Sequence, residues 1–114
     1  MKNRTFDLIV YGATSFVGQI LTRYLFEHIG VGGKVNWAIA GRSEKKLSVL
    51  KSSLGSNADS LSVIVADASD EVALTTMCQS ARVIASTVGP YALYGEPLVK
   101  ACAENGTDYC DLCG

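Results

Sequence analysis

The chain has 114 residues, of which 48% are hydrophobic and 18% are charged, a composition that excludes an intrinsically disordered chain and fits one folded domain. Its formal net charge of −1 gives no broad electrostatic attraction to nucleic acid. No apolar run approaches the roughly 20 residues of a membrane span, and the N-terminus lacks the apolar region and cleavage site of a secretory signal.

The stretch from Phe6 to Leu25 predicts a strand, a tight turn and a helix. Residues 6–11 are an apolar run, apart from Asp7, with β-branched and aromatic side chains, typical of a strand buried on both faces of a parallel sheet. The small residues 12–15 form the turn. The following helix has apolar residues at i, i+3, i+4, i+7 and i+8, so we expect that face to be its buried face. These residues are Val17, Ile20, Leu21, Tyr24 and Leu25.

The rest of the chain alternates between strand and helix patterns. Further strands are predicted over residues 34–40, 61–66, 82–88 and 107–112. Ser43 and Ser69 are the expected N-caps of the second and third helices. Gly55 ends the second helix, and Gly106 ends a fourth that tolerates Pro97 in its first turn.

Five strands alternating with four helices predict a parallel sheet, because each crossover helix returns the chain in the same direction. The fold class is therefore α/β, a Rossmann-type doubly wound sheet of order 3-2-1-4-5 with helices on both faces, and residues 1–114 form one domain. The segments that follow the strands should meet at the carboxyl edge of the sheet. They are residues 12–18, 41–43, 67–69 and 88–91.

The first turn has the spacing of a phosphate-binding loop, with Ser15 between Gly12 and Gly18. Gly12 permits the tight turn, and Gly18 lets the helix approach the strand. The Ser15 hydroxyl either bonds a phosphate or caps the helix. The N–H groups and the positive end of the helix dipole favour a pyrophosphate at this point. The predicted cofactor-binding residues here are Gly12, Ala13, Thr14, Ser15, Phe16, Val17 and Gly18.

Residues 41–43 follow the second strand, where enzymes that prefer NAD tend to carry an acid for the ribose 2′-hydroxyl. This chain has Arg42 there, between Gly41 and Ser43, with two lysines one turn further on. A guanidinium suits a 2′-phosphate by its charge and by its paired donors. The alternative is a solvated arginine at a helix start. We predict NADP as the cofactor in preference to NAD, with Gly41, Arg42 and Ser43 binding it.

The two other strand ends complete the predicted cofactor site. Asp67 and Ala68 follow the third strand and could contact the adenine, although a loop aspartate before a helix is an equal alternative. Thr87, Gly89 and Pro90 follow the fourth strand, where the nicotinamide half would pass. A glycine there lets the backbone approach the cofactor, and the proline restricts the loop.

Cys110-x-x-Cys113 has the spacing of a metal or redox pair, but a structural zinc needs four ligands and no second pair accompanies it. We therefore expect no metal. Without a secretory signal, the four cysteines indicate reduced thiols and a cytoplasmic protein. The sequence shows no Ser/His/Asp arrangement, no paired acids in a plausible cleft and no Tyr-x-x-x-Lys pair, so no catalytic residue is assigned.

With GATSFVG, AIAGRSEKKL and TVGPYALYGEPLVKACAENGTDYCDLCG in this order, the chain resembles the saccharopine dehydrogenase-like oxidoreductases over essentially its whole length. It is similar to the N-terminal NADP-binding domain of the branch that includes trans-acting enoyl reductases. Ser15 departs from the glycine common in that family. The resemblance implies a longer protein, in which a second α/β domain builds the substrate pocket and contacts for a homodimer. Such proteins transfer a hydride between nicotinamide and a C=N or C=C bond, so this fragment alone should bind NADP(H) without turnover.

Two other functions remain open from the sequence. One is a non-catalytic module that senses NADP and regulates a partner. The other is a short-chain-type reductase or epimerase, whose catalytic Tyr-x-x-x-Lys pair would lie beyond residue 114.

Overall fold

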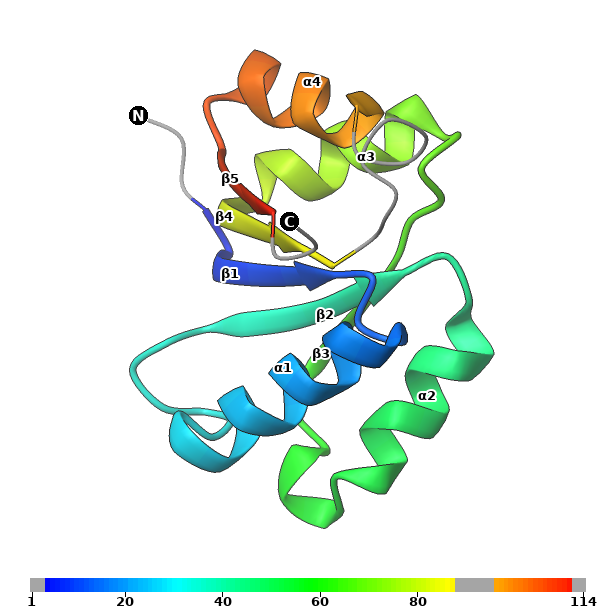
Figure 1. Cartoon of the computed structure of the whole chain (residues 1–114). Helices are drawn as coiled ribbons and strands as arrows, with labels where there is room; N and C mark the ends of the chain where they lie inside the picture. The colour runs from blue at the N-terminus through cyan, green and yellow to red at the C-terminus, as the bar shows by residue number, and fades with distance from the viewer. Residues whose placement is uncertain (1–3, 88–95, 112–114) are drawn as a thin grey trace.

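The computed structural model describes residues 4–87 and 96–111, and in them five strands alternate with four α-helices (Figure 1). The strands are β1 (Phe6–Tyr11), β2 (Trp37–Gly41), β3 (Ser62–Val65), β4 (Ala81–Ser86) and β5 (Asp108–Asp111). The helices are α1 (Phe16–His28), α2 (Glu44–Ser53), α3 (Glu71–Gln79) and α4 (Glu96–Asn105), and a short 3-10 helix, η1 (Ser56–Ala58), precedes β3. None of the helices in this part of the chain is long and apolar enough to cross a membrane.

The strands form one parallel sheet of order β3-β2-β1-β4-β5, which confirms the predicted topology. β1 is the central strand, and Val10 pairs with Ile39 of β2 on one side and with Ala85 of β4 on the other. The strand order reverses beside β1, since the chain continues outward through β2 and β3 and then returns to β4. A ligand of such a sheet binds at the carboxyl edge beside this reversal.

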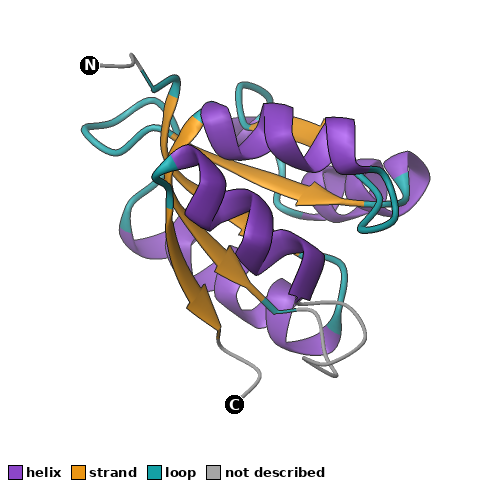
Figure 2. Ribbon diagram, turned by 90° about the horizontal axis from the view of Figure 1, so that it is seen from above, coloured by secondary structure: helices purple, strands orange, loops and turns teal. Residues whose placement is uncertain are grey.

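The helices cover both faces of the sheet: α1 and α2 lie on one face, α3 and α4 on the other (Figures 1 and 2). Successive side chains of a strand point to opposite faces. Val10 of β1 therefore packs with Leu47 of α2, whereas its neighbour Ile9 packs with Leu74 of α3 and Leu98 of α4. All five side chains are almost completely buried, so β1 contributes to both halves of the core.

Element bounds differ slightly from those predicted. The strand predicted over residues 34–40 begins only at Trp37, because the N–H of Asn36 bonds the Asp7 carboxylate instead of the backbone of β1. The strands predicted over 82–88 and 107–112 are Ala81–Ser86 and Asp108–Asp111. These shifts change no pairing between strands.

The predicted N-cap is confirmed for α2 and wrong for α3. The Ser43 hydroxyl accepts from the Lys46 N–H at 3.2 Å. The N-cap of α3 is Asp70, whose carboxylate accepts from the Ala73 N–H at 3.1 Å. Ser69 bonds the carboxylate of Asp67 instead, through both its N–H and its hydroxyl, and this local turn moves the helix start by one residue.

The predicted buried face of α1 is confirmed for Leu25, which is buried, and for Leu21, which packs against the core, but it is wrong for the other three residues. Gly18, Thr22 and Leu25 face the sheet, whereas Ile20 and Tyr24 are 55% and 57% exposed. The cause is the contact of Gly18 with the turn after β1, which fixes the rotation of the helix about its axis. The outward stripe of Phe16, Val17, Ile20 and Tyr24 is defined here as the outer face of α1.

A substitution at Thr22 can test how closely α1 packs on the sheet. Its hydroxyl is fully buried and has no hydrogen-bond partner in the described part of the chain. Leaving a buried hydroxyl without a partner is unfavourable, and valine has nearly the same shape. We expect Thr22→Val to raise the free energy of unfolding by about 1 kcal/mol, measured by urea denaturation. A decrease would contradict the described packing of α1.

Candidate functional site

A cleft of about 640 Å³ lies at the carboxyl edge of the sheet. It brings together residues that follow β1, β2, β3 and β4, as the topology requires. The cleft is lined by Tyr11, Gly12, Thr14, Ser15, Gly41, Arg42, Ser43, Lys46, Asp67, Ala68, Ser69, Thr87 and Pro97. Most of the residues predicted from sequence therefore share one cavity.

The turn after β1 is held to β2 by backbone hydrogen bonds. The N–H groups of Gly12 and Ala13 both donate to the Ala40 carbonyl, at 2.9 and 3.2 Å, and the Ser15 N–H donates to the Gly12 carbonyl at 3.0 Å. Gly12 has a φ of +83°, a conformation that favours glycine. The chain thus turns sharply from the strand into α1.

Gly18 allows α1 to begin directly against this turn. A Cβ at residue 18 would overlap the Gly12 carbonyl oxygen and would lie 2.8 Å from the Cα of Ala13. Any side chain would push the helix away from β1. Ala13 and Gly18 are accordingly buried beneath the cleft rather than exposed on its surface.

The first turn of α1 leaves donors free for a ligand. Among the described residues, the N–H groups of Thr14, Phe16 and Val17 have no hydrogen-bond acceptor. Unpaired N–H groups at a helix start carry the positive end of the helix dipole and bind anions. The turn therefore has the chemistry that a pyrophosphate needs.

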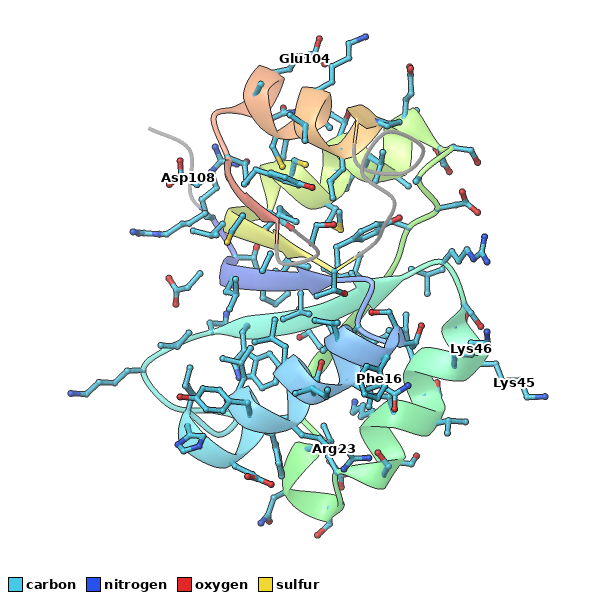
Figure 3. The ribbon with its side chains drawn as sticks, in the orientation of Figure 1. Phe16, Arg23, Lys45, Lys46, Glu104 and Asp108 are labelled. Carbon is cyan, nitrogen blue, oxygen red and sulfur yellow. The ribbon has the colours of Figure 1, made fainter. Side chains whose placement is uncertain are left out.

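Two cations lie at the start of α2, beside the end of β2. Arg42 is exposed and precedes the N-cap Ser43, and Lys46 lines the same cleft one turn later. Lys45 and Lys46 both project from the first turn of α2 (Figure 3), but Lys45 does not line this cleft. The sequence showed both lysines and could not separate them, because the choice depends on the direction of the helix.

The ends of β1 and β3 form a hydrogen-bonded part of the cleft wall. The Asp67 carboxylate accepts from the Ser69 N–H at 2.9 Å and from its hydroxyl at 2.8 Å. These bonds, and the Arg42 charge nearby, lower the pKa of Asp67. The Tyr11 hydroxyl donates to the Ala66 carbonyl at 2.9 Å. Burial, and then the Asp67 charge, raise the pKa of Tyr11 to about 12, so it stays neutral.

Thr87 connects the end of β4 to the turn after β1. Its N–H donates to the Tyr11 carbonyl at 2.9 Å, and its hydroxyl donates to the Gly12 carbonyl at 2.7 Å. The side chain is 2% exposed. Gly89 and Pro90, the other residues predicted after this strand, lie outside the described residues.

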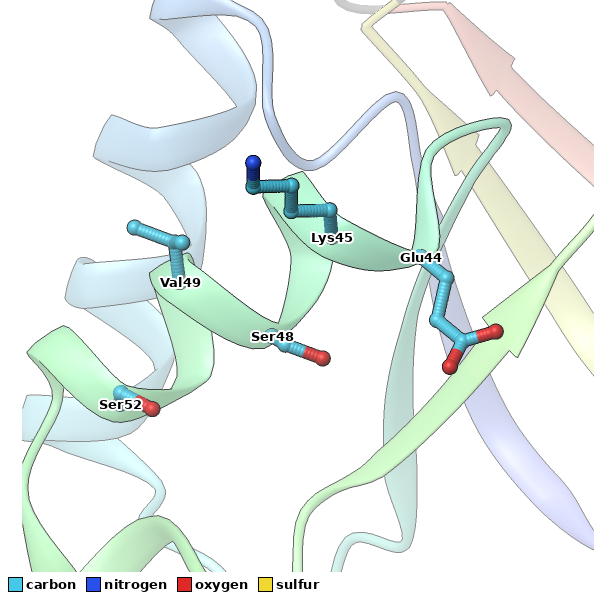
Figure 4. Close-up of a pocket in the computed structure, with 5 residues that line it drawn as sticks. All are labelled: Glu44, Lys45, Ser48, Val49 and Ser52. Atoms are coloured by element: carbon cyan, nitrogen blue, oxygen red, sulfur yellow. The ribbon is translucent and has the colours of Figure 1, made fainter.

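A second hollow lies along the outer side of α2 (Figure 4). All of its lining residues belong to this one helix: Glu44, Lys45, Ser48, Val49 and Ser52. No loop or strand end converges on it, in contrast to the cleft at the sheet edge. It therefore lacks the fixed polar groups of a ligand site.

The three described cysteines are not among the residues that line the cleft. Cys78 and Cys102 are buried between α3 and α4 with their sulfurs 3.5 Å apart, and Cys110 is exposed on β5. Cys113 lies outside the described residues. Within the described ranges, no group of three or more His, Cys, Asp or Glu side chains could hold a metal ion.

Residues 8–114 match the family model described as the saccharopine dehydrogenase NADP binding domain. Among curated proteins, the chain is 46% identical over 111 residues to a trans-acting enoyl reductase of Mycobacterium bovis, and 46% identical over 112 residues to one of Mycobacterium leprae. Each alignment covers 97% of this chain and 26% of the relative. The chain thus spans about a quarter of the length of these relatives.

Solved structures support the fold. Saccharopine dehydrogenase (L-Glu forming) of Saccharomyces cerevisiae superposes with a TM-score of 0.73 at 22% identity, covering 93% of this chain and 21% of that one. A short-chain dehydrogenase/reductase of Veillonella parvula in complex with NADP superposes with a TM-score of 0.69 at 16% identity, covering 93% and 46%. At these identities the likeness concerns the architecture alone.

Gly18→Ala tests the contact between α1 and the turn. We expect the free energy of unfolding to fall by about 2–3 kcal/mol in urea denaturation, because backbone atoms must move to admit the methyl group. Gly33→Ala is the matched control, since a Cβ there would meet only the Ile29 carbonyl oxygen, at 3.5 Å. Equal effects of the two substitutions would disprove the contact.

Because of Tyr11, the free energy of unfolding should fall as the pH rises into the alkaline range. A pKa that rises from 10.0 to about 12 on folding means that the folded chain binds the proton more tightly. Its contribution is therefore complete below pH 10 and is lost as the pH approaches 12. We expect a loss of about 2–3 kcal/mol over this window, measured by denaturant unfolding.

Tyr11→Phe should remove this part of the pH dependence. Tyr24→Phe, at an exposed position on α1, should retain it. The same alkaline loss in Tyr11→Phe as in the parent chain would show that another group is responsible.

Proposed function

Because this chain belongs to the family of saccharopine dehydrogenase NADP-binding domains, we propose that it holds NADP(H) along the carboxyl-edge cleft for a longer oxidoreductase. The observation that carries the proposal is the presence in one cleft of an anion-binding turn after β1 and two cations at the start of α2. These groups match the two phosphate-bearing parts of NADP, the pyrophosphate and the 2′-phosphate.

The turn of residues 12–18 is the proposed pyrophosphate site. The free N–H groups of Thr14, Phe16 and Val17 supply the hydrogen bonds, and the bare Cα of Gly12 leaves room for the phosphates. Ala13 and Gly18 contribute by their small size, because they let the helix start lie against β1. The residues thus fit the cofactor without rearrangement of the turn.

Arg42, Ser43 and Lys46 are the proposed 2′-phosphate site. The guanidinium offers paired donors, and the ammonium adds a second positive charge. Both side chains can approach an anion in the cleft that they line. Gly41 lines the cleft beside them, where the ribose would pass. An acid that would hold a 2′-hydroxyl is absent from residues 41–43, which supports NADP over NAD.

The remaining wall would contact the two rings. Asp67 and Ala68 lie where the adenine would be held, and Ser69 fixes the direction of the Asp67 carboxylate. Thr87, Gly89 and Pro90 are the proposed contacts on the nicotinamide side. The bound cofactor supplies the hydride, and the contribution of these residues is to hold and orient it.

The whole protein is proposed to be a cytoplasmic, homodimeric reductase that acts on a C=N or C=C bond. Its relatives are about four times as long, so a second domain would supply the substrate pocket and the dimer contacts. The outer face of α1 is apolar and exposed, with Phe16 80% exposed, which supports the proposal that another part of the whole protein packs against it. Relatives named enoyl reductases favour this proposal over an NADP sensor or a short-chain-type enzyme.

Substitutions at the start of α2 test the 2′-phosphate site. We expect Arg42→Glu to weaken NADPH binding about a hundredfold and NADH binding by far less, measured by calorimetric titration at fixed salt. Lys46→Ala should weaken NADPH about fivefold, whereas Lys45→Ala, the matched control outside the cleft, should change it little. Equal losses for NADPH and NADH in Arg42→Glu would remove the assignment.

A further inference from the structure

We propose that Ser15 and Thr87 form a positioning pair that holds the pyrophosphate turn in its binding geometry, and that the Ser15 hydroxyl is not itself a phosphate ligand. The inference rests on the proposed NADP site, because it concerns how that site is held. It extends that proposal by assigning a shared positioning role to the hydroxyls of Ser15 and Thr87, two residues that line the cleft.

Ser15 and Thr87 belong to a series of linked hydrogen bonds. Which hydroxyl donates to which follows from the two backbone groups at the ends of the series, the Gly12 carbonyl and the Gly18 N–H. The Thr87 hydroxyl lies 2.7 Å from the Gly12 carbonyl and 3.2 Å from the Tyr11 carbonyl. Since a carbonyl can only accept, Thr87 donates its single proton to one of these two oxygens. The Ser15 oxygen accepts from the Gly18 N–H at 3.0 Å, which can only donate. Ser15 and Thr87 lie 3.1 Å apart, and Ser15 must therefore be the donor between them.

This direction leaves Ser15 with no proton to donate to a phosphate. Its proton goes to Thr87, through the hydroxyl at 3.1 Å or the carbonyl at 3.4 Å, and its oxygen caps α1 through Gly18. A bond from this hydroxyl to a phosphate would break its bond to Thr87. The backbone N–H groups of Phe16 and Val17 need no such exchange, since they have no acceptor among the described residues.

These hydrogen bonds connect three parts of the site: the turn after β1, the start of α1 and the end of β4. Gly12 begins the turn, Gly18 lies in the first turn of α1, and Thr87 follows β4. Thr87 is almost completely buried, so loss of its hydroxyl would remove a hydrogen bond from the Gly12 carbonyl and from the Ser15 hydroxyl in a place with little access to water. The pair thereby fixes the free N–H groups of α1 relative to the strand on the nicotinamide side.

The test compares Thr87→Val, which removes the hydroxyl and keeps the shape, with Thr87→Ser, which keeps the hydroxyl. Amide hydrogen exchange of residues 12–18 is measured by NMR without nucleotide, and NADPH and NADH affinities by calorimetry. We expect Thr87→Val to speed exchange at Gly18 about tenfold and to weaken both nucleotides by a similar factor. Thr87→Ser should stay within about twofold of the parent chain on both measurements.

Ser15→Ala should reproduce the effect of Thr87→Val, and the double variant should be little worse than either single one, because the two act as one unit. Thr22→Val is the matched control. It removes another buried threonine hydroxyl, in the same helix, that bonds neither residue of the pair, and it should change neither exchange in the turn nor affinity.

Unchanged exchange at Gly18 in Thr87→Val would overturn the hydrogen-bond chain. Faster exchange with unchanged affinity would overturn the positioning role, as would a loss that appears equally at every amide of the sheet. A loss of affinity in Ser15→Ala alone would make Ser15 a direct phosphate ligand. If the parent chain bound neither nucleotide, the proposed NADP site would fail, while exchange in the turn would still decide whether the pair holds it.

Discussion

The close contact between Gly18 and the Gly12 carbonyl is the constraint on which the rest of the site depends. It determines where α1 begins and which of its faces meets the sheet. Thr14 of this turn lines the cleft, and its N–H and those of Phe16 and Val17 have no acceptor among the described residues. The same rotation turns Phe16 and Tyr24 outward. The Gly18 contact therefore accounts both for the geometry of the turn of residues 12–18 and for the exposed outer face of α1.

The parallel sheet places groups of different charge around this turn. Arg42 and Lys46 supply positive charge beside β2, and Asp67 supplies a carboxylate beside β3 that hydrogen bonds keep ionised. Tyr11 remains neutral because burial and Asp67 both oppose its ionisation. The cleft therefore has positive charge near the starts of α1 and α2 and a hydrogen-bond acceptor on the remaining wall.

Sequence patterns sufficed for the strand order, because each buried run and each amphipathic helix is a local signal and parallel crossovers restrict the topology. The family and its cofactor also followed from contiguous motifs. Only part of the buried face of α1 followed, since apolar periodicity included the exposed Ile20 and Tyr24 as well as the buried Leu25, while the rotation depends on Gly18. The roles of Lys46 and Ser69 depend on side-chain direction and on a local turn, which the spacing of residues does not specify.

We propose that the phosphates of the cofactor contact the first turns of α1 and α2. This proposal is tested most directly by adding NADPH to the ¹⁵N-labelled chain and following the backbone amide signals by NMR. We expect the largest shifts at Thr14, Phe16, Val17 and residues 42–46, while the amides of α3 stay nearly unchanged. Saturable shifts confined to α3 and α4, or no shifts at millimolar nucleotide, would contradict it.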